Sequence, residues 1–264
     1  MTNHSNYLRP EHVEGHPKPV EEPPSGGVPE RRRGSNHQVQ TCLPALDPGS
    51  QLNKQFPSPK FLFSEVTAYL QKFGRHTYGQ HFTIIEEDYE TIYKLFVYLY
   101  QDEQQAEKLN IKLHKGILLT GPVGCGKTTL MNLLKHIHPP HKQFVMVPTR
   151  KIAYEFSEYG IKTIHKYTTQ SFRTQGANVL PKDYCFDDLG VETSLPHFGA
   201  SLNVMAEILL GRYDLFVSHQ MLTYITTNLS VIEIEEFYGN RVRSRMREML
   251  NVLAFKADIG DKRR

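Results

Sequence analysis

Residues 116–134 read GILLTGPVGCGKTTLMNLL, and this stretch decides the expected fold. It begins with a short apolar run, and its last residues have apolar side chains at helical spacing. Between the two, residues 121–128 fit the pattern G-x-x-x-x-G-K-[ST] at every specified position. A strand, a glycine-rich loop and a helix in this order predict an α/β fold that binds a nucleoside triphosphate.

The residues of this loop have distinct expected roles. Glycines allow backbone N–H groups to close around phosphates, and the start of a helix favours anions. We expect Lys127 to reach the β- and γ-phosphates, where it assists catalysis, and Thr128 to bind Mg²⁺ through its hydroxyl. The predicted phosphate-binding residues are Gly121, Pro122, Val123, Gly124, Cys125, Gly126, Lys127, Thr128 and Thr129.

The distribution of proline divides the chain. Most of the 16 prolines among the 264 residues lie in the first 59 positions, where aliphatic residues are few. Such a segment buries too little apolar surface to offset the entropy lost on ordering. We therefore expect a disordered tail over residues 1–58, a helical linker region over residues 59–110 and the nucleotide-binding core over residues 111–264.

The rest of the composition restricts the compartment of the protein. No apolar run is long enough to span a membrane, and the N-terminus lacks an apolar signal segment. The 3 cysteines are widely spaced, which favours reduced thiols over disulfides. These features predict a cytoplasmic protein. The net charge of +3 is too small to indicate nucleic-acid binding by itself.

Apolar periodicity predicts the elements around the loop. Strands are expected over residues 116–120, 144–147, 184–186, 222–226 and 252–255. Helices are expected over residues 61–73, 86–107, 129–134, 150–159, 202–210 and 240–249, with an irregular basic stretch over residues 161–176. This alternation predicts a five-stranded parallel sheet between helices, whose ligands bind beyond the carboxyl ends of the strands.

Two acids follow the predicted strand over residues 184–186. We expect Asp187 to bind Mg²⁺ and Asp188 to orient or deprotonate the attacking water. Turns are also rich in aspartate, but the phosphate loop upstream favours the catalytic interpretation. Asn228 follows the next strand, so it is expected either to bond the γ-phosphate or water, or to serve as a helix cap or turn residue before Ser230.

Arginines gather in the last predicted helix. Arg241 and Arg245 are one helical turn apart, so both project from one face. An arginine supplied by a neighbouring subunit stabilises charge that develops on the transferred phosphoryl group. The alternative is a solvated basic face, which is the usual meaning of a charge run.

Cations interleaved with aromatic residues suggest a site for single-stranded DNA between the second and third predicted strands. Cations track the phosphates of a single strand and aromatic rings stack on its bases. The alternative is an ordinary polar connection. The residues concerned are Tyr159, Lys162, His165, Lys166, Tyr167, Thr168, Ser171, Phe172 and Arg173.

Taken together, the motifs resemble those of the DnaC-type helicase loaders and IstB-type transposition ATPases. The resemblance covers about residues 80–258. It rests on GPVGCGKT (121–128), FDDLGVE (186–192), RY (212–213), ITTNL (225–229) and GNRVRSRM (239–246).

These families are AAA+ ATPases, so the resemblance implies an AAA+ core, ATP with Mg²⁺, and hydrolysis completed between subunits of a homo-oligomeric ring or spiral. It implies a sensor role for Asn228 and an arginine-finger role for Arg245, with Arg241 as the second candidate. Many AAA+ proteins have Glu as the second acid, so Glu192 competes with Asp188 for activating water. The chain ends soon after the fifth strand, so no full C-terminal lid is expected.

The resulting hypothesis is an ATP hydrolase that acts on DNA and loads or remodels a replicative helicase in DNA replication. Single-stranded DNA and the helicase, or a transposase, are the expected partners. The alternative hypothesis is a transposition-accessory adaptor in which ATP only switches the affinity for DNA or transposase. The sequence does not choose between these clients.

Overall fold

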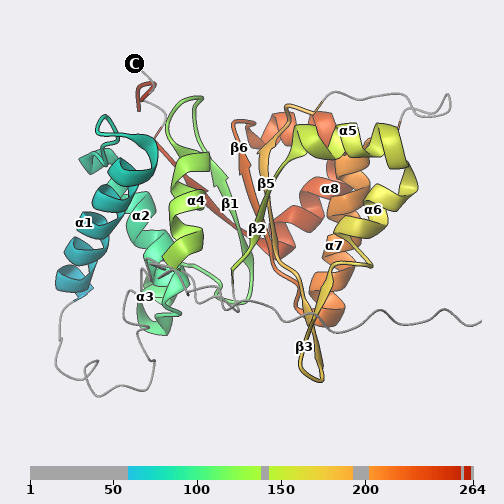
Figure 1. Cartoon of the computed structure of the whole chain (residues 1–264), viewed down its shortest axis with the longest axis horizontal. Helices are drawn as coiled ribbons and strands as arrows, with labels where there is room; N and C mark the ends of the chain where they lie inside the picture. Colours follow the sequence, from blue (N-terminus) through green and yellow to red (C-terminus); the bar gives the residue numbers. More distant parts are fainter. Residues whose placement is uncertain (1–58, 138–142, 193–201, 257–258, 263–264) are drawn as a thin grey trace, which may run out of the picture. The chain divides into compact units, whose positions relative to one another are not determined.

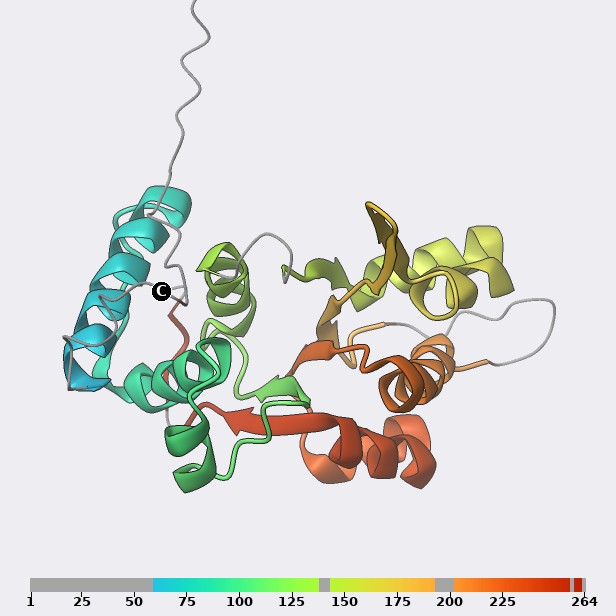
Figure 2. The ribbon, with the colours of Figure 1, turned by 90° about the horizontal axis from the view of Figure 1, so that it is seen from below.

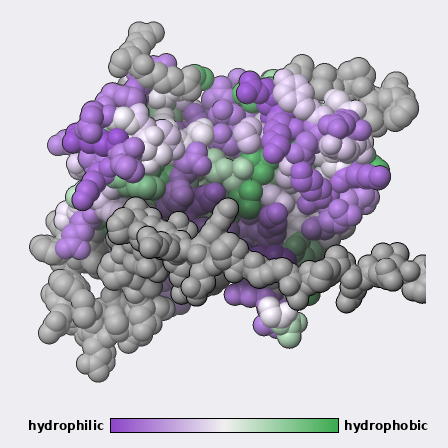
Figure 3. Space-filling model, in the orientation of Figure 1, coloured by the Kyte–Doolittle hydropathy of each residue, from purple (hydrophilic) through white to green (hydrophobic). Residues whose placement is uncertain are grey.

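The computed structural model describes residues 59–137, 143–192, 202–256 and 259–262 (Figure 1). The predicted tail over residues 1–58 lies outside the described residues. No helix of the described part is long and apolar enough to cross a membrane. In the view of Figure 3 the surface over α1 and α5 is mainly hydrophilic.

The core of the fold is a five-stranded parallel sheet with the order β2-β5-β6-β1-β7. Each predicted strand overlaps an observed one, so the predicted sheet between helices is confirmed. The strands are β1 (Gly116–Thr120), β2 (Val145–Pro148), β5 (Tyr184–Leu189), β6 (Thr223–Thr227) and β7 (Leu250–Ala254). This order places β6 between the strand that precedes the phosphate loop and the strand that ends in acids.

Helices cover both faces of the sheet (Figures 1 and 2). One apolar cluster joins Ile117 and Leu119 to the helices α1 to α4, and the other joins Leu118 to α5 to α8. Successive strand residues point to opposite faces, so both faces are buried, as parallel sheets require. The helices are α1 (Pro59–Tyr78), α2 (Glu86–Leu99), α3 (Glu103–Lys108), α4 (Lys127–Ile137), α5 (Thr149–Tyr159), α6 (Ile161–Tyr167), α7 (Val204–His219) and α8 (Val231–Met249).

The helix predicted over residues 86–107 is divided into α2 and α3, so that prediction is wrong in its continuity. Gln101 between them has a φ of 55°, which a helix does not allow. The Asp102 side chain then caps α3 by accepting a hydrogen bond of 3.0 Å from Gln105 N. A local cap therefore overrides a continuous apolar pattern.

The stretch over residues 161–176 is not irregular, which corrects the prediction. It forms α6 and most of an antiparallel hairpin of β3 (Phe172–Gln175) and β4 (Asn178–Pro181). Gly160 and Gly176 have positive φ and end α5 and β3, respectively. Tyr167 of α6 is 2% exposed, so long-range burial rather than local periodicity orders this segment.

The two last helices are longer than predicted. α7 continues past Leu210 because Tyr213 and Phe216 pack against the same apolar cluster. α8 begins at Val231, where Ser230 and Glu233 form a capping box. Gly239, with a φ of 84°, interrupts the helical geometry inside α8, which explains why the periodicity is clear only after it.

Candidate functional site

The phosphate loop connects β1 to α4 and leaves open space above Gly126. This glycine has a φ of 98°, and a Cβ atom there would meet no atom within 4 Å. Its conformation, rather than crowding, therefore requires glycine. The loop has the backbone geometry and the free space that a phosphate cradle needs.

Lys127 lies buried at the start of α4, with 6% of its surface exposed. Its Nζ donates to Gly121 O and Pro122 O, both at 2.8 Å, and contacts Cys125 Sγ at 3.8 Å. Within the described residues no carboxylate forms an ion pair with it. A buried cation whose partners are neutral carbonyls is costly unless an anion joins it. This lysine therefore fits a site for a bound anion.

Thr128 and Asp187 join the loop to the end of β5. Thr128 Oγ1 donates a hydrogen bond of 2.8 Å to Asp187 Oδ1, and Thr226 Oγ1 donates one of 2.6 Å to the same oxygen. Burial raises the pKa of the Asp187 carboxyl above its ordinary value, and these two hydrogen bonds oppose the shift. The motifs predict Thr128 and Asp187 at one Mg²⁺ site, but they assign no role to Thr226.

Asp188 has a fixed backbone and an exposed side chain. Its φ is 55°, and the β5 to β6 register is irregular here. Its N–H donates to Thr226 Oγ1 and its carbonyl accepts from Thr149 Oγ1, both at 2.8 Å. Its carboxylate makes no hydrogen bond or ion pair with any described residue. The surrounding structure holds a sparsely populated conformation and leaves the acid open to solvent.

Glu192, the rival acid, is engaged within the fold. Its Oε2 accepts a hydrogen bond of 2.9 Å from Gly190 N, and its Oε1 accepts one from the hydroxyl of Tyr238 in α8. Both carboxylate oxygens therefore have protein donors, in contrast to those of Asp188.

Asn228 is exposed directly after β6, at the edge of the sheet between the loop and the two acids. It is not the helix cap, because Ser230 Oγ accepts from Glu233 N at 3.2 Å and Ser230 N donates to Glu233 Oε2 at 2.7 Å. Its amide makes no hydrogen bond with a described residue. The structure thus brings Lys127, Thr128, Asp187, Asp188 and Asn228 to one end of the sheet.

Arg245 is not part of this assembly in the same chain, and Arg241 lies in the middle of α8. The second half of α8 leads into β7, and Leu250 at the start of β7 pairs with Gly116 at the start of β1. Arg245 therefore lies toward the opposite end of the sheet from the phosphate loop. Arg241 is exposed, whereas Arg245 contacts Tyr213 and Glu248.

The expected site for single-stranded DNA is only partly available. Tyr167 is buried and its hydroxyl donates to Glu155 Oε2 at 2.9 Å, so it cannot stack on a base. The Lys166 ammonium pairs with the same carboxylate at 2.7 Å, and Ser171 is fully buried. Tyr159, Lys162 and His165 remain exposed. The local sequence pattern does not predict the burial of Tyr167, because its partners, such as Glu155 of α5, lie on other elements.

The segment after β7 also touches the loop, which the sequence did not indicate. Lys262 N donates to Gly124 O at 3.2 Å, and Lys262 Nζ pairs with Asp88 Oδ1 at 2.5 Å. A Cβ atom at Gly124 would lie 2.1 Å from Asp261 Oδ1. Glycine is therefore needed at Gly124 for close approach as well as for its positive φ.

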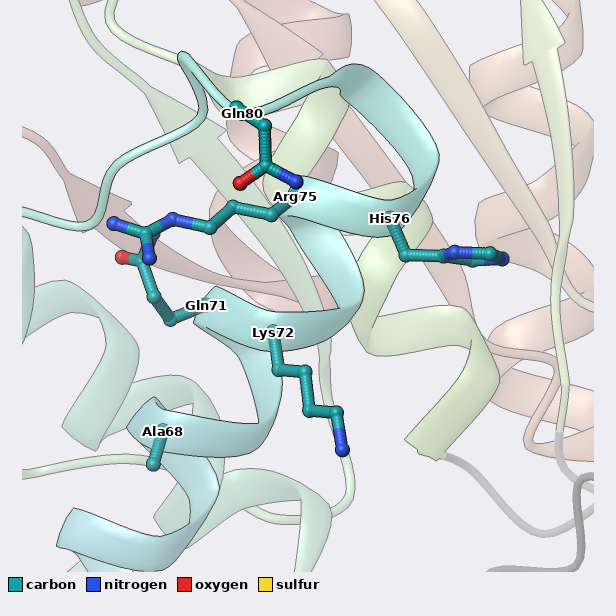
Figure 4. Close-up of a pocket in the computed structure, with 6 residues that line it drawn as sticks. All are labelled: Ala68, Gln71, Lys72, Arg75, His76 and Gln80. Atoms are coloured by element: carbon teal, nitrogen blue, oxygen red, sulfur yellow. The ribbon is translucent and has the colours of Figure 1, made fainter.

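A separate hollow lies on α1 and contains none of the predicted site residues (Figure 4). Three of its side chains are basic. The residues that line it are Ala68, Gln71, Lys72, Arg75, His76 and Gln80.

Comparison with solved structures finds the DnaC helicase loader, with a TM-score of 0.42 and 16% sequence identity, over 66% of this chain and 93% of that one. It also finds DnaI, with a TM-score of 0.40 and 17% identity, over 66% of this chain and 88% of that one. No protein-family model matches the sequence, and a search of curated proteins finds no match.

Proposed function

We propose that this chain is an AAA+ ATPase that binds ATP and Mg²⁺ and acts on DNA, loading or remodelling a replicative helicase. The observation that carries the proposal is the 2.8 Å hydrogen bond from Thr128 Oγ1 to Asp187 Oδ1 beside the buried Lys127. Hydroxyl and carboxylate oxygens are hard ligands of the kind that Mg²⁺ prefers. A cation at this point and an anion at Lys127 would satisfy both ends of one Mg²⁺–triphosphate.

The roles of the chain's own residues follow from their placement. Bound ATP with Mg²⁺ supplies the phosphoryl group and neutralises its charge. Lys127 would hold the β- and γ-phosphates, with Thr128 and Asp187 as metal ligands. Asp188 would accept a proton from the attacking water, since its carboxylate is exposed and without a described partner. Asn228 would orient that water or the γ-phosphate.

An arginine supplied by a second chain would stabilise the charge that develops on the transferred phosphoryl group. Arg245 lies near the end of α8, toward the amino end of β1 and away from its own phosphate loop. This placement supports a role for Arg245 at a neighbouring subunit's nucleotide, with Arg241 as the second candidate. Oligomerisation into a ring or spiral would then complete each site.

The DNA and helicase parts of the proposal rest on the motifs that resemble DnaC-type loaders. Exposed Tyr159, Lys162 and His165 on α5 and α6 would supply a stacking ring, a cation and an imidazole ring for single-stranded DNA. Tyr167 is removed from this surface by its burial.

Phosphate release, measured with and without single-stranded DNA, tests the proposal. We expect DNA to stimulate turnover in the wild type, and Lys127→Ala and Arg245→Ala each to abolish it. A mixture of the two variants should regain part of the activity, because some sites then receive an intact loop from one chain and an intact arginine from the other. Slow turnover that Asp188→Asn leaves unchanged, with DNA binding that still needs ATP, would instead favour an ATP-switched adaptor for transposition.

A further inference from the structure

Three side chains on α7 and α8 form a closed set of contacts around Arg245. The Arg245 guanidinium carbon lies 4.4 Å from the centre of the Tyr213 ring, and its Nη1 donates to Tyr213 Oη at 3.2 Å. The same Nη1 donates to Glu248 Oε1 at 3.3 Å, and Tyr213 Oη donates to Glu248 Oε2 at 2.6 Å. A cation over a ring face that is also tied to a carboxylate has few rotamers left.

We propose that Tyr213 and Glu248 are positioning residues that hold the Arg245 guanidinium ready for an anionic phosphoryl group of a second copy of this chain. This inference rests on the proposed function, in which Arg245 acts in trans. It adds Glu248, which the motifs do not contain, and it gives Tyr213 of the RY motif a physical role.

The contacts leave part of the guanidinium for a ligand. Both hydrogen bonds use Nη1, whereas Nε and Nη2 of Arg245 donate to no described residue. The side chain remains 38% exposed. A guanidinium held by one nitrogen keeps a planar pair of N–H donors, which matches two oxygens of a phosphate.

The ring that holds Arg245 is carried by a fixed element. Arg212, the preceding residue, is fully buried and donates to Thr223 Oγ1, Tyr167 O and Leu222 O at 2.7, 3.1 and 2.6 Å. These bonds fix the rotation of α7 about its axis, which directs Tyr213 toward α8. Rigid elements position functional side chains more accurately than loops do.

Charge keeps the set together near neutral pH. The hydrogen bond from Tyr213 and the Arg245 charge lower the pKa of the Glu248 carboxyl, so it stays ionised.

The neighbouring arginines are held differently. Arg241 and Arg247 are exposed and form no ion pair within the described residues, and Arg243 pairs with Glu235 of its own helix at 2.5 Å. The contact with an aromatic ring of α7 distinguishes Arg245 among them. Holding a long side chain in place before assembly removes an entropy cost that an unheld arginine would bear on binding.

The test uses the full chain with Tyr213→Leu, Tyr213→Phe and Glu248→Gln. We expect DNA-stimulated kcat to fall roughly tenfold to hundredfold in Tyr213→Leu and Glu248→Gln, the cost of a misplaced catalytic group. Tyr213→Phe keeps the ring and should fall less. The Kd of a fluorescent ATP analogue should stay unchanged in all three variants, because Tyr213, Arg245 and Glu248 lie away from the chain's own phosphate loop. The matched control is Glu235→Gln, which breaks the Arg243 ion pair on the same helix and should keep the wild-type kcat.

Subunit mixing separates positioning from a general structural role. In the mixture of Lys127→Ala and Arg245→Ala chains, the active sites take Arg245 from the Lys127→Ala chain. Adding Tyr213→Leu to that chain should lower the regained activity, whereas adding it to the Arg245→Ala chain should not. Equal losses from both placements would overturn the proposal.

A comparison of the single variants gives the second criterion. If Arg245→Ala is inactive while Tyr213→Leu and Glu248→Gln keep full activity, the positioning role fails and the proposed function stands. If Arg245→Ala itself keeps full activity, the trans role of Arg245 in the proposed function fails, and the positioning role with it.

Discussion

Each end of the central sheet holds two residues of opposite charge, and their surroundings differ. At the amino end lie the buried Arg212 and the half-buried Asp183, which is the residue before β5. At the carboxyl end lie Lys127 and Asp187. Removing a charge from water is costly at either end. The two ends differ in the groups that offset this cost.

The amino end satisfies its charges with fixed protein groups. Arg212 donates to three oxygens, and its guanidinium lies 5.4 Å from the ring centre of Tyr184. Asp183 Oδ1 accepts a hydrogen bond of 3.0 Å from Leu222 N. Each of these groups therefore strengthens the connection between α7 and the starts of β5 and β6.

The carboxyl end is satisfied only in part. Lys127 has neutral carbonyl partners, and Asp187 has two hydroxyl donors. Beside them the side chains of Asp188 and Asn228 are exposed and form no hydrogen bond or ion pair with a described residue. Buried charge with a complete set of partners indicates structure, and buried charge beside free polar groups indicates a ligand site.

Lys127→Met should cause the largest effect, a loss of ATP turnover without a loss of stability. It should lower ATP turnover by at least about 10³-fold, or about 4 kcal/mol in the barrier. The free energy of unfolding should change little, because no carboxylate loses an ion-pair partner. Phosphate release and urea unfolding on the same preparation measure both quantities. A large loss of stability would remove the distinction between the two ends.

Arg212→Met should produce the reverse. Removing the buried guanidinium leaves Thr223 Oγ1 and the Tyr167 and Leu222 carbonyls without their donor, and it removes the positive charge near Asp183. Breaking such a buried polar network costs about 3 kcal/mol or more. Arg212→Lys should recover little of this, because one ammonium cannot reach three fixed acceptors. Urea unfolding measures the loss, and the ATP affinity of the folded fraction should be unchanged. A stable Arg212→Met variant with weakened ATP binding would contradict the structural assignment.

The sequence predicts the carboxyl end better than the amino end for a physical reason. The phosphate loop and the two acids follow strands directly, so local order brings Thr128 to Asp187. The chemistry of that edge is therefore readable from strand ends alone. The amino end depends on contacts between segments that are distant in the sequence, such as Arg212 with Tyr167. No local sequence pattern predicts such contacts.

Long-range contacts also explain where the sequence-based expectations differ from the structure. Tyr167 is an aromatic residue among cations, which is typical of DNA-binding segments. In the structure it is buried in the core, and its hydroxyl bonds Glu155 of α5. A role for Thr226 is not predicted, because threonine is common in strands. This role depends on hydrogen bonds to Asp187 and Asp188 of the neighbouring strand. The continuous helix over residues 86–107 fails at Gln101 because periodicity does not detect a left-handed residue.

A smaller contrast concerns pH. Burial raises the pKa of Asp183 to about 6. The folded protein thus binds this proton more tightly than the unfolded chain does, so the group stabilises the fold at low pH and loses that contribution as pH rises through about 6. Relative to Asp183→Asn, the wild type should lose about 2 to 3 kcal/mol of unfolding free energy between pH 4 and pH 7.

Urea unfolding of both proteins across this pH range checks the prediction. The control repeats the measurement with Mg²⁺ and ATP. Their expected site is the carboxyl end, so they should not change a pH dependence that comes from Asp183. A stability difference that does not vary with pH would show that Asp183 does not titrate in this range.

The smallest expected effect tests Thr226, the hydroxyl that joins the two acids. Thr226→Val keeps the shape but removes the donor to Asp187 Oδ1 and the acceptor for Asp188 N. The unpaired N–H should cost about 1 to 2 kcal/mol of stability. Because Asp187 is then less well oriented, the Mg²⁺ concentration for half-maximal turnover should rise roughly tenfold, as it does when an outer-shell partner of a metal ligand is lost.

Thr227→Val is the matched control, since the Thr227 hydroxyl is equally buried and donates to Leu189 O at 2.6 Å. It should lower stability by a similar amount and leave the Mg²⁺ requirement unchanged, because Leu189 O is not a candidate ligand. Turnover at a series of Mg²⁺ concentrations, together with urea unfolding, measures both effects. If the two variants change the Mg²⁺ requirement equally, hydroxyls at this edge only hold strands together, as the groups at the amino end do.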